Sequence, residues 1–185
     1  MSAIIFSGPP CTGKSTIAAC IAKKVGATHL EMDFVRLRLI PDSHTAEIRQ
    51  IAYRAIHLIA EHLLTLGHSV ILDATYGPFS SRRDLADVIA RTGAQTYLIQ
   101  CRLEADEAAR RFRLRSAKGE VHAATDLDET RVATLAGAFP FANTGILLNT
   151  ATPIDESVQV VLSHLSGPEQ FDVADWLRDP GGQRI

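Results

Sequence analysis

A stretch near the N-terminus has the residue types and spacing needed to hold a chain of phosphates. It reads Gly8-Pro9-Pro10-Cys11-Thr12-Gly13-Lys14-Ser15 and fits the pattern G-x-x-x-x-G-K-[ST]. The glycines permit a tight loop whose backbone N–H groups point inward, at the positive end of the helix that follows. Lys14 would reach the β- and γ-phosphates, and the Ser15 hydroxyl would take one place on Mg²⁺. The next residue, Thr16, would cap or pack the helix. ATP with Mg²⁺ is therefore the expected ligand.

The flanking sequence supports this interpretation of the loop. Residues 3–6 are apolar and predict a buried strand, and residues 17–24 favour a helix that ends near Gly26. A strand, a glycine loop and a helix in this order form the context that a phosphate-binding loop requires.

Two carboxylates follow predicted strands and are candidates for chemistry at the phosphates. Asp33 follows a short strand over residues 28–32, and Asp73 closes the aliphatic strand of residues 69–73. Ligands of open α/β sheets bind outside the carboxyl ends of the strands, so we expect Asp33 and Arg36 to face the crevice of the phosphate loop. Asp33 could instead cap the next helix. Asp73 could hold the magnesium shell through water or contact the acceptor substrate, and the sequence does not separate these two roles.

Arginines form a basic face on the helix predicted over residues 102–115. Arg111 and Arg115 are four residues apart and share one side, where they could stabilise charge on a phosphoryl group during its transfer. Glu107 lies one turn earlier, so ordinary ion pairing is the alternative. Residues 116–122 have little apolar content, and we expect them to form the tip of a closing lid.

The rest of the chain continues the alternation of strands and helices. Strands are predicted over residues 94–101 and 146–150, and helices from Ser43 to about Gly67, over 80–93, from 125 toward 139, and from 154 or 155 to 165. Arg82 and Arg83 open the second of these helices and are either solvated or in contact with substrate charge. Residues 167–185 resemble a loose tail that Phe171 and Trp176 would pin in part to the body. We find no internal repeat and expect one domain over residues 1–166, with a lid at about 113–126.

Composition limits the partners and the location that we expect. The net charge of −2 argues against a protein that coats nucleic acid electrostatically. The three cysteines, Cys11, Cys20 and Cys101, are odd in number and widely spaced, so neither a disulfide framework nor a zinc site is expected. There is no apolar run of about 20 residues and no basic leader before the first strand, which favours a cytoplasmic protein without membrane contact.

Together, these motifs resemble those of the P-loop kinase families that group the zeta toxins, chloramphenicol phosphotransferase, the kinase domain of polynucleotide kinases and AAA_33-type proteins. The resemblance covers about residues 3–165. The matching positions are GPPCTGKST, the D-x-x-R pair of Asp33 and Arg36, the I-L-D-A-T-Y segment with Asp73 and Thr75, the R-x-x-x-R pair of Arg111 and Arg115, and the L-L-N-T segment with Asn149 and Thr150. Only the first of these motifs is diagnostic alone, and the others gain weight from their order along the chain.

The resemblance implies a role for each matching residue. Asp33 would be the general base for the acceptor hydroxyl, and Arg36 would anchor the acceptor. Lys14, Arg111 and Arg115 would act on the transferring phosphate. The remaining assignments place Asp73 and Thr75 at the acceptor, Arg111 at the nucleotide, and Asn149 and Thr150 beside the adenine.

These patterns predict an α/β protein with the P-loop NTPase fold: a five-stranded parallel sheet of order 2-3-1-4-5, helices on both faces and a helical lid. The expected function is ATP-dependent transfer of the γ-phosphoryl group to a hydroxyl of a small molecule or of a nucleic-acid end. A carboxylate at the acceptor favours a hydroxyl, because a phosphate acceptor is already deprotonated and needs cations instead. The alternatives are a nucleoside monophosphate-type kinase and a regulatory module that binds ATP and hydrolyses it slowly. A zeta-like toxin would meet a neutralising antitoxin, but we identify no surface for a protein partner in the sequence.

Overall fold

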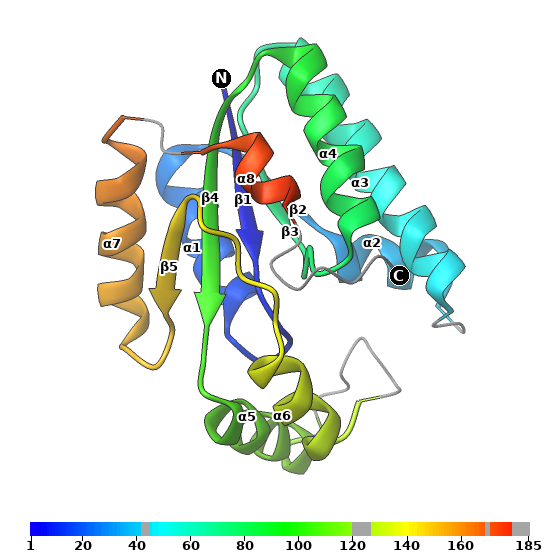
Figure 1. Ribbon diagram of the computed structural model, residues 1–185, viewed down its shortest axis with the longest axis vertical. Helices are drawn as coiled ribbons and strands as arrows, with labels where there is room; N and C mark the ends of the chain where they lie inside the picture. Colours follow the sequence, from blue (N-terminus) through cyan, green and yellow to red (C-terminus); the bar gives the residue numbers. More distant parts are fainter. Residues whose placement is uncertain (42–44, 120–126, 169–170, 179–185) are drawn as a thin grey trace.

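The core of the protein is a sheet of five parallel strands, seen in a computed structural model that describes residues 1–41, 45–119, 127–168 and 171–178 (Figure 1). The strands are β1 (Ser2–Ser7), β2 (Thr28–Glu31), β3 (Val70–Asp73), β4 (Gln95–Arg102) and β5 (Ile146–Asn149). Their order across the sheet is β2-β3-β1-β4-β5, and each neighbouring pair is parallel. This arrangement confirms the predicted fold class and the predicted strand order.

Helices cover both faces of the sheet. They are α1 (Lys14–Val25), α2 (Met32–Leu39), α3 (Ala46–Thr65), α4 (Phe79–Thr92), α5 (Ala105–Ala117), α6 (Glu129–Gly137), α7 (Ile154–Leu165) and α8 (Val173–Leu177). Residues Ile4 and Phe6 of β1 pack toward α1 and α7, whereas Ala3 and Ile5 pack toward α3, α4 and α8. Because successive side chains of a strand point to opposite faces, a strand covered on both sides needs an unbroken apolar run, and β1 has one. None of the described helices is long and apolar enough to cross a membrane.

Helices α5 and α6 lie beyond the carboxyl ends of the strands, at the bottom of Figure 1. They share a small apolar cluster in which Leu103, Ala108 and Val132 pack with Cys11 of the phosphate loop. The helices that carry the predicted lid arginines are therefore packed directly on the phosphate loop. The expected lid tip at residues 120–126 lies outside the described residues.

Two helices differ from the sequence-based prediction. Helix α2 begins at Met32, where the second strand was expected to end, and its exposed Phe34 and Leu37 break the apolar stripe by which a helix is identified. Helix α8 lies in the segment that was expected to be a loose tail. Its Trp176 is only 1% exposed and packs against Phe171, with the ring centroids 5.4 Å apart. The predicted start of the long helix near residue 43 lies outside the described residues.

Candidate active site

The phosphate loop is held in its shape by close backbone contacts. Gly8 has a positive φ of 143°, and a Cβ atom at this position would collide with the carbonyl oxygen of Cys101, so only glycine fits. The backbone N–H of Gly8 donates to the carbonyl of Thr75 at 3.1 Å. Within the loop, the buried Thr12 hydroxyl donates to the carbonyl of Pro9 at 3.0 Å. The first bond joins the loop to the segment after β3, and Gly8 packs closely against Cys101 of β4.

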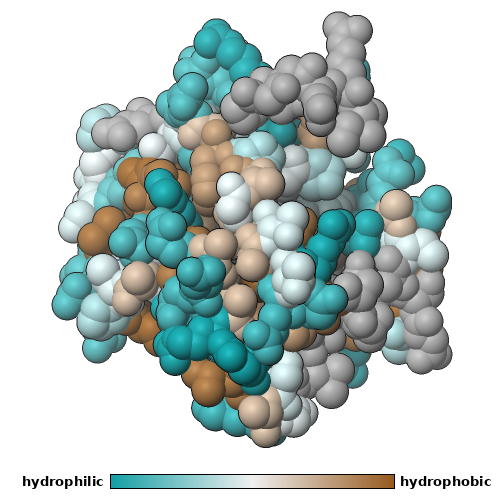
Figure 2. All heavy atoms as spheres, turned by 60° about the horizontal axis from the view of Figure 1, so that its bottom comes forward, coloured by the Kyte–Doolittle hydropathy of each residue, from teal (hydrophilic) through white to brown (hydrophobic). Residues whose placement is uncertain are grey.

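A large cleft opens at the loop, with a volume of about 1420 Å³. Figure 2 looks toward this end of the molecule, where hydrophilic residues stand beside pale and brown ones. The lining residues that the sequence analysis named are Pro9, Pro10, Cys11, Thr12, Gly13, Lys14, Ser15, Thr16, Asp33, Thr75, Arg111, Arg115 and Thr150. The fold therefore brings residues from five separate motifs into one cleft.

Asp33 lies in the first turn of α2 with its side chain 46% exposed in the cleft. Arg36, one turn later on α2, has a fully buried side chain whose Nε lies 3.9 Å from the Asp33 carboxylate. Arg36 is not among the described residues that line the cleft. Arg36 therefore contacts Asp33 from a buried position and does not face the cleft in which an acceptor would bind.

The predicted carboxylate of the third strand has a different environment. Asp73 is 2% exposed, and its carboxylate lies 3.3 Å from Nε2 of His29 on the neighbouring strand. It is not among the described residues that line the cleft. The cleft is lined instead by Glu31, the register partner of Asp73, whose carboxylate lies close enough to the Ser15 side chain to interact with it.

Sequence reasoning missed Glu31 as a site residue. Burial raises the pKa of its carboxyl, and the nearby charges of Asp73 and Asp33 raise it further. The interactions with His29 and Ser15 lower this pKa and so oppose the shift. The one available signal was its position at the carboxyl end of a strand, two residues before Asp33. That signal is weak because the same residue could equally have been a solvated end of a short edge strand.

Arg111, one of the two predicted lid arginines, makes two hydrogen bonds that fix its side chain. Arg111 donates through Nε to Glu107 at 3.0 Å and through a terminal nitrogen to the carbonyl of Thr150 at 2.8 Å. Hydrogen bonds from Arg110 and Arg111 lower the pKa of Glu107 to about 2. Arg111 therefore both forms the ion pair that was the alternative interpretation and lines the cleft.

Three cations surround the loop at Cys11. Burial raises the pKa of the Cys11 thiol, while the charges of Arg115, Lys14 and Arg111 act in the opposite direction. The ammonium of Lys14 and the guanidinium groups of Arg111 and Arg115 belong to residues that line the cleft together with Cys11. A polyphosphate in the loop would be surrounded by this positive charge.

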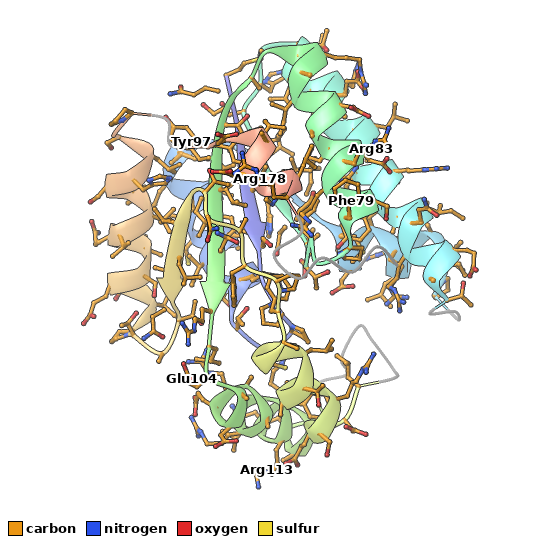
Figure 3. All side chains as sticks on the ribbon, viewed as in Figure 1. Phe79, Arg83, Tyr97, Glu104, Arg113 and Arg178 are labelled. Carbon is orange, nitrogen blue, oxygen red and sulfur yellow. The ribbon has the colours of Figure 1, made fainter. Side chains whose placement is uncertain are left out.

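The other pair of predicted arginines does not face the cleft. Arg82 is 2% exposed and donates to the backbone carbonyls of Trp176 at 2.9 Å and Gly77 at 3.3 Å. Arg83 is exposed on α4 and is not among the described lining residues (Figure 3). Of the two earlier alternatives, Arg83 is the solvated one, and Arg82 ties α8 to the loop after β3.

The wall opposite the phosphate loop contains further residues that the sequence did not single out. The Tyr53 hydroxyl is within 2.9 Å of the Thr75 hydroxyl and accepts from the backbone N–H of Tyr76 at 3.1 Å. Other polar lining residues of this wall are Arg49, Gln50, Ser80, Ser81, Arg131 and Thr134. They come from α3, α4 and α6, so only the tertiary fold brings them together.

The region after β5 forms the side of the cleft next to α1. Thr150, Thr152 and Ile154 line it together with Thr16 and Ile17. The predicted Asn149 is not among the described lining residues, and its Oδ1 accepts from the backbone N–H of Ala151 at 3.1 Å. Asn149 shapes the turn, whereas Thr150 faces the cleft.

Comparison with known proteins agrees with this architecture. The AAA_33 family model, described as an AAA domain, matches residues 4–140. The uncharacterized protein Rv2004c of Mycobacterium tuberculosis (strain ATCC 25618 / H37Rv) is 32% identical over 171 residues, with 83% of this chain and 32% of that protein covered. The chain thus spans about a third of the length of the curated relatives that it matches.

Solved structures of kinases have the same fold. The APS kinase CysC of Mycobacterium tuberculosis, in complex with AMPPNP and APS, has a TM-score of 0.67 at 21% identity, with 90% of this chain and 98% of that chain covered. A gluconokinase of Sinorhizobium meliloti 1021 has a TM-score of 0.65 at 20% identity, with 89% and 91% covered. The chain therefore has a kinase-like P-loop fold.

Proposed function

The chain belongs to the AAA_33 family, and from that premise we propose that it is an ATP-dependent kinase that transfers the γ-phosphoryl group to a hydroxyl acceptor. The observation that carries the proposal is the placement of Asp33. Its half-exposed carboxylate shares one cleft with Lys14 and with the lid arginines Arg111 and Arg115. A base on the acceptor side and cations on the phosphate side are the two groups that transfer to a hydroxyl needs. The named structural neighbours are kinases as well.

In the proposed reaction, the Asp33 carboxylate accepts the proton of the acceptor hydroxyl. The hydroxyl oxygen bonds to the γ-phosphorus as the bond from that phosphorus to the β,γ-bridging oxygen breaks, and ADP leaves. Lys14 and the lid arginines stabilise the charge that spreads over the phosphoryl oxygens. The Arg36 guanidinium, 3.9 Å from the Asp33 carboxylate, would help to hold that carboxylate in place.

Magnesium fits the residues at the loop. Ser15 offers a hydroxyl oxygen, and the nearby Glu31 carboxylate lines the same cleft. Mg²⁺ prefers such oxygen ligands and is usually held by one or two carboxylates, water and substrate phosphates. When bound, the ion would neutralise charge on the β- and γ-phosphates. Among the described residues, no group of three or more His, Cys, Asp or Glu side chains is arranged to hold a metal ion.

Two substitutions test the proposal once an acceptor is found. Screening sugars, nucleosides, oligonucleotides and aminoglycosides for ATP consumption, and identifying the product by mass, supplies that acceptor. Asp33→Asn should then lower kcat by roughly 10²- to 10⁴-fold with little change in ATP affinity. Lys14→Ala should weaken both ATP binding and turnover. ATP binding without a phosphorylated product from any acceptor would instead support the regulatory module.

A nucleoside monophosphate-type kinase is the second candidate, because Arg49 and Arg131 also line the cleft. Such cations suit an acceptor that is already a phosphate and needs no base. Nucleoside monophosphates therefore belong in the screen. If one of them is the acceptor and Asp33→Asn leaves its turnover within a few-fold of the original, the hydroxyl proposal is wrong.

A further inference from the structure

We infer that Glu31, and not Asp73, is the carboxylate that holds the hydrated Mg²⁺ of the bound nucleotide beside the Ser15 hydroxyl. The inference rests on the proposed function only in requiring that Mg²⁺ and ATP bind in the cleft. Of the two roles that the sequence left open for Asp73, it transfers the one in the magnesium shell to Glu31.

The first argument is the position of the Glu31 side chain. This residue lies at the N-cap position of α2, yet its side chain makes no capping hydrogen bond to that helix. Its carboxylate instead lies close enough to interact with the side chain of Ser15, the P-loop residue whose hydroxyl is the expected metal ligand, and it lines the cleft. Because the Glu31 side chain is not bound to the helix end, its carboxylate is free of that contact on the side where it lines the cleft.

The second argument is the confinement of Asp73. Its carboxylate lies 3.3 Å from His29, and the residue is 2% exposed. Holding a hydrated ion requires a carboxylate that water can reach. Glu31 meets this requirement because it lines the cleft, whereas Asp73 is not among the described lining residues.

The third argument is strand register. Glu31 and Asp73 are paired across β2 and β3, so the two carboxylates occupy the same row at the same edge of the sheet. The glutamate side chain is longer by one methylene and stands beside Ser15. One row therefore supplies both a buried carboxylate, fixed by His29, and a second one that faces the cleft.

The test measures nucleotide affinity and needs no acceptor. Binding of a fluorescent ATP analogue is titrated in Mg²⁺ and in EDTA, and the ratio of the two dissociation constants gives the gain in affinity due to the metal. Glu31→Gln should lower this gain by roughly tenfold while leaving binding in EDTA unchanged or tighter, since a negative charge is removed. Asp73→Asn should keep the gain within about twofold. Direct titration with Mn²⁺, followed by electron paramagnetic resonance, should show the same ranking.

Asp73 is buried, so its variant could unfold, and circular dichroism must accompany the titration. If Asp73→Asn does not fold, His29→Gln separates the same pair while keeping the carboxylate, and it should also keep the metal gain. A gain that is lost in Asp73→Asn or His29→Gln, or that is retained in Glu31→Gln, overturns the inference. Those results leave the proposed function standing, whereas a wild-type protein that binds no ATP would refute the proposed function along with the inference.

Discussion

Arg115 and Arg113 lie two residues apart on α5 but in different surroundings. Arg115 lines the cleft, whereas Arg113 extends at the bottom of the molecule in Figure 3 and lies 3.7 Å from Glu129. Arg115→Ala should lower kcat by roughly 10²- to 10³-fold with little change in ATP affinity, because a lid cation acts mainly on charge that develops in the transition state. Arg113→Ala, the matched control, should change kcat by less than about twofold. Steady-state kinetics with a working acceptor provide the measurement, and equal effects of the two substitutions would contradict the role of Arg115.

At the scale of an element, the strand-loop-helix unit depends on the close approach of Gly8 to β4. Gly8→Ala should disrupt the loop, because the new Cβ would collide with the Cys101 carbonyl. We expect destabilisation of about 1–3 kcal/mol and loss of ATP binding. Gly26 also has a positive φ, but a Cβ there would meet nothing within 4 Å, so Gly26→Ala should cost only about 1 kcal/mol and keep ATP binding. Urea unfolding and nucleotide titration measure both effects, and an intact nucleotide site in Gly8→Ala would show that the loop tolerates the shift.

Helix α8 is a second element whose contribution can be tested. Trp176 is 1% exposed, and its carbonyl accepts from the buried Arg82. Trp176→Ala should destabilise the protein by about 3–5 kcal/mol, because it leaves a large cavity against Tyr76. Arg178→Ala, two residues away at a side chain that is 76% exposed, should change stability by less than about 0.5 kcal/mol. Equal unfolding midpoints for the two variants in urea would mean that α8 does not contribute to the cooperative core.

For the whole molecule, stability should decrease with acidification because of one buried histidine. Burial lowers the pKa of His57 to about 4, below the ordinary value near 6.5 that applies to the unfolded chain. Between these two values the unfolded chain binds the extra proton, so this contribution is complete above pH ~6.5 and is lost as the pH falls toward ~4. The slope from this group reaches at most about 1.4 kcal/mol per pH unit.

Urea unfolding at several pH values tests this prediction. His57→Gln removes the titrating group and should flatten the loss of stability between pH ~6.5 and ~4 by up to one proton equivalent. His62 is exposed on the same helix, so His62→Gln serves as the control and should leave the slope unchanged. An unchanged slope in His57→Gln would assign the acid sensitivity to other groups.

The sequence by itself determined the architecture and the phosphate loop. The apolar run of residues 3–6 favours a strand that is covered on both faces, and the spacing of Gly8, Gly13, Lys14 and Ser15 can be recognised without the rest of the chain. The positions of Lys14 and Ser15 follow from the same local pattern. Such features involve contacts between near neighbours in the chain, so they can be predicted without knowing the tertiary structure.

Only the tertiary structure decided which polar side chains face the cleft. Glu31 and Asp73 each end a strand and look alike in sequence. In the structure Glu31 lines the cleft where β2 turns into α2, whereas the Asp73 carboxylate is buried against His29. Likewise, Arg82 and Arg115 both looked suited to substrate charge, and packing with α8 buried the first of them. Burial of a polar group depends on distant parts of the chain that supply its partners, and hydrophobic periodicity carries no information about those partners.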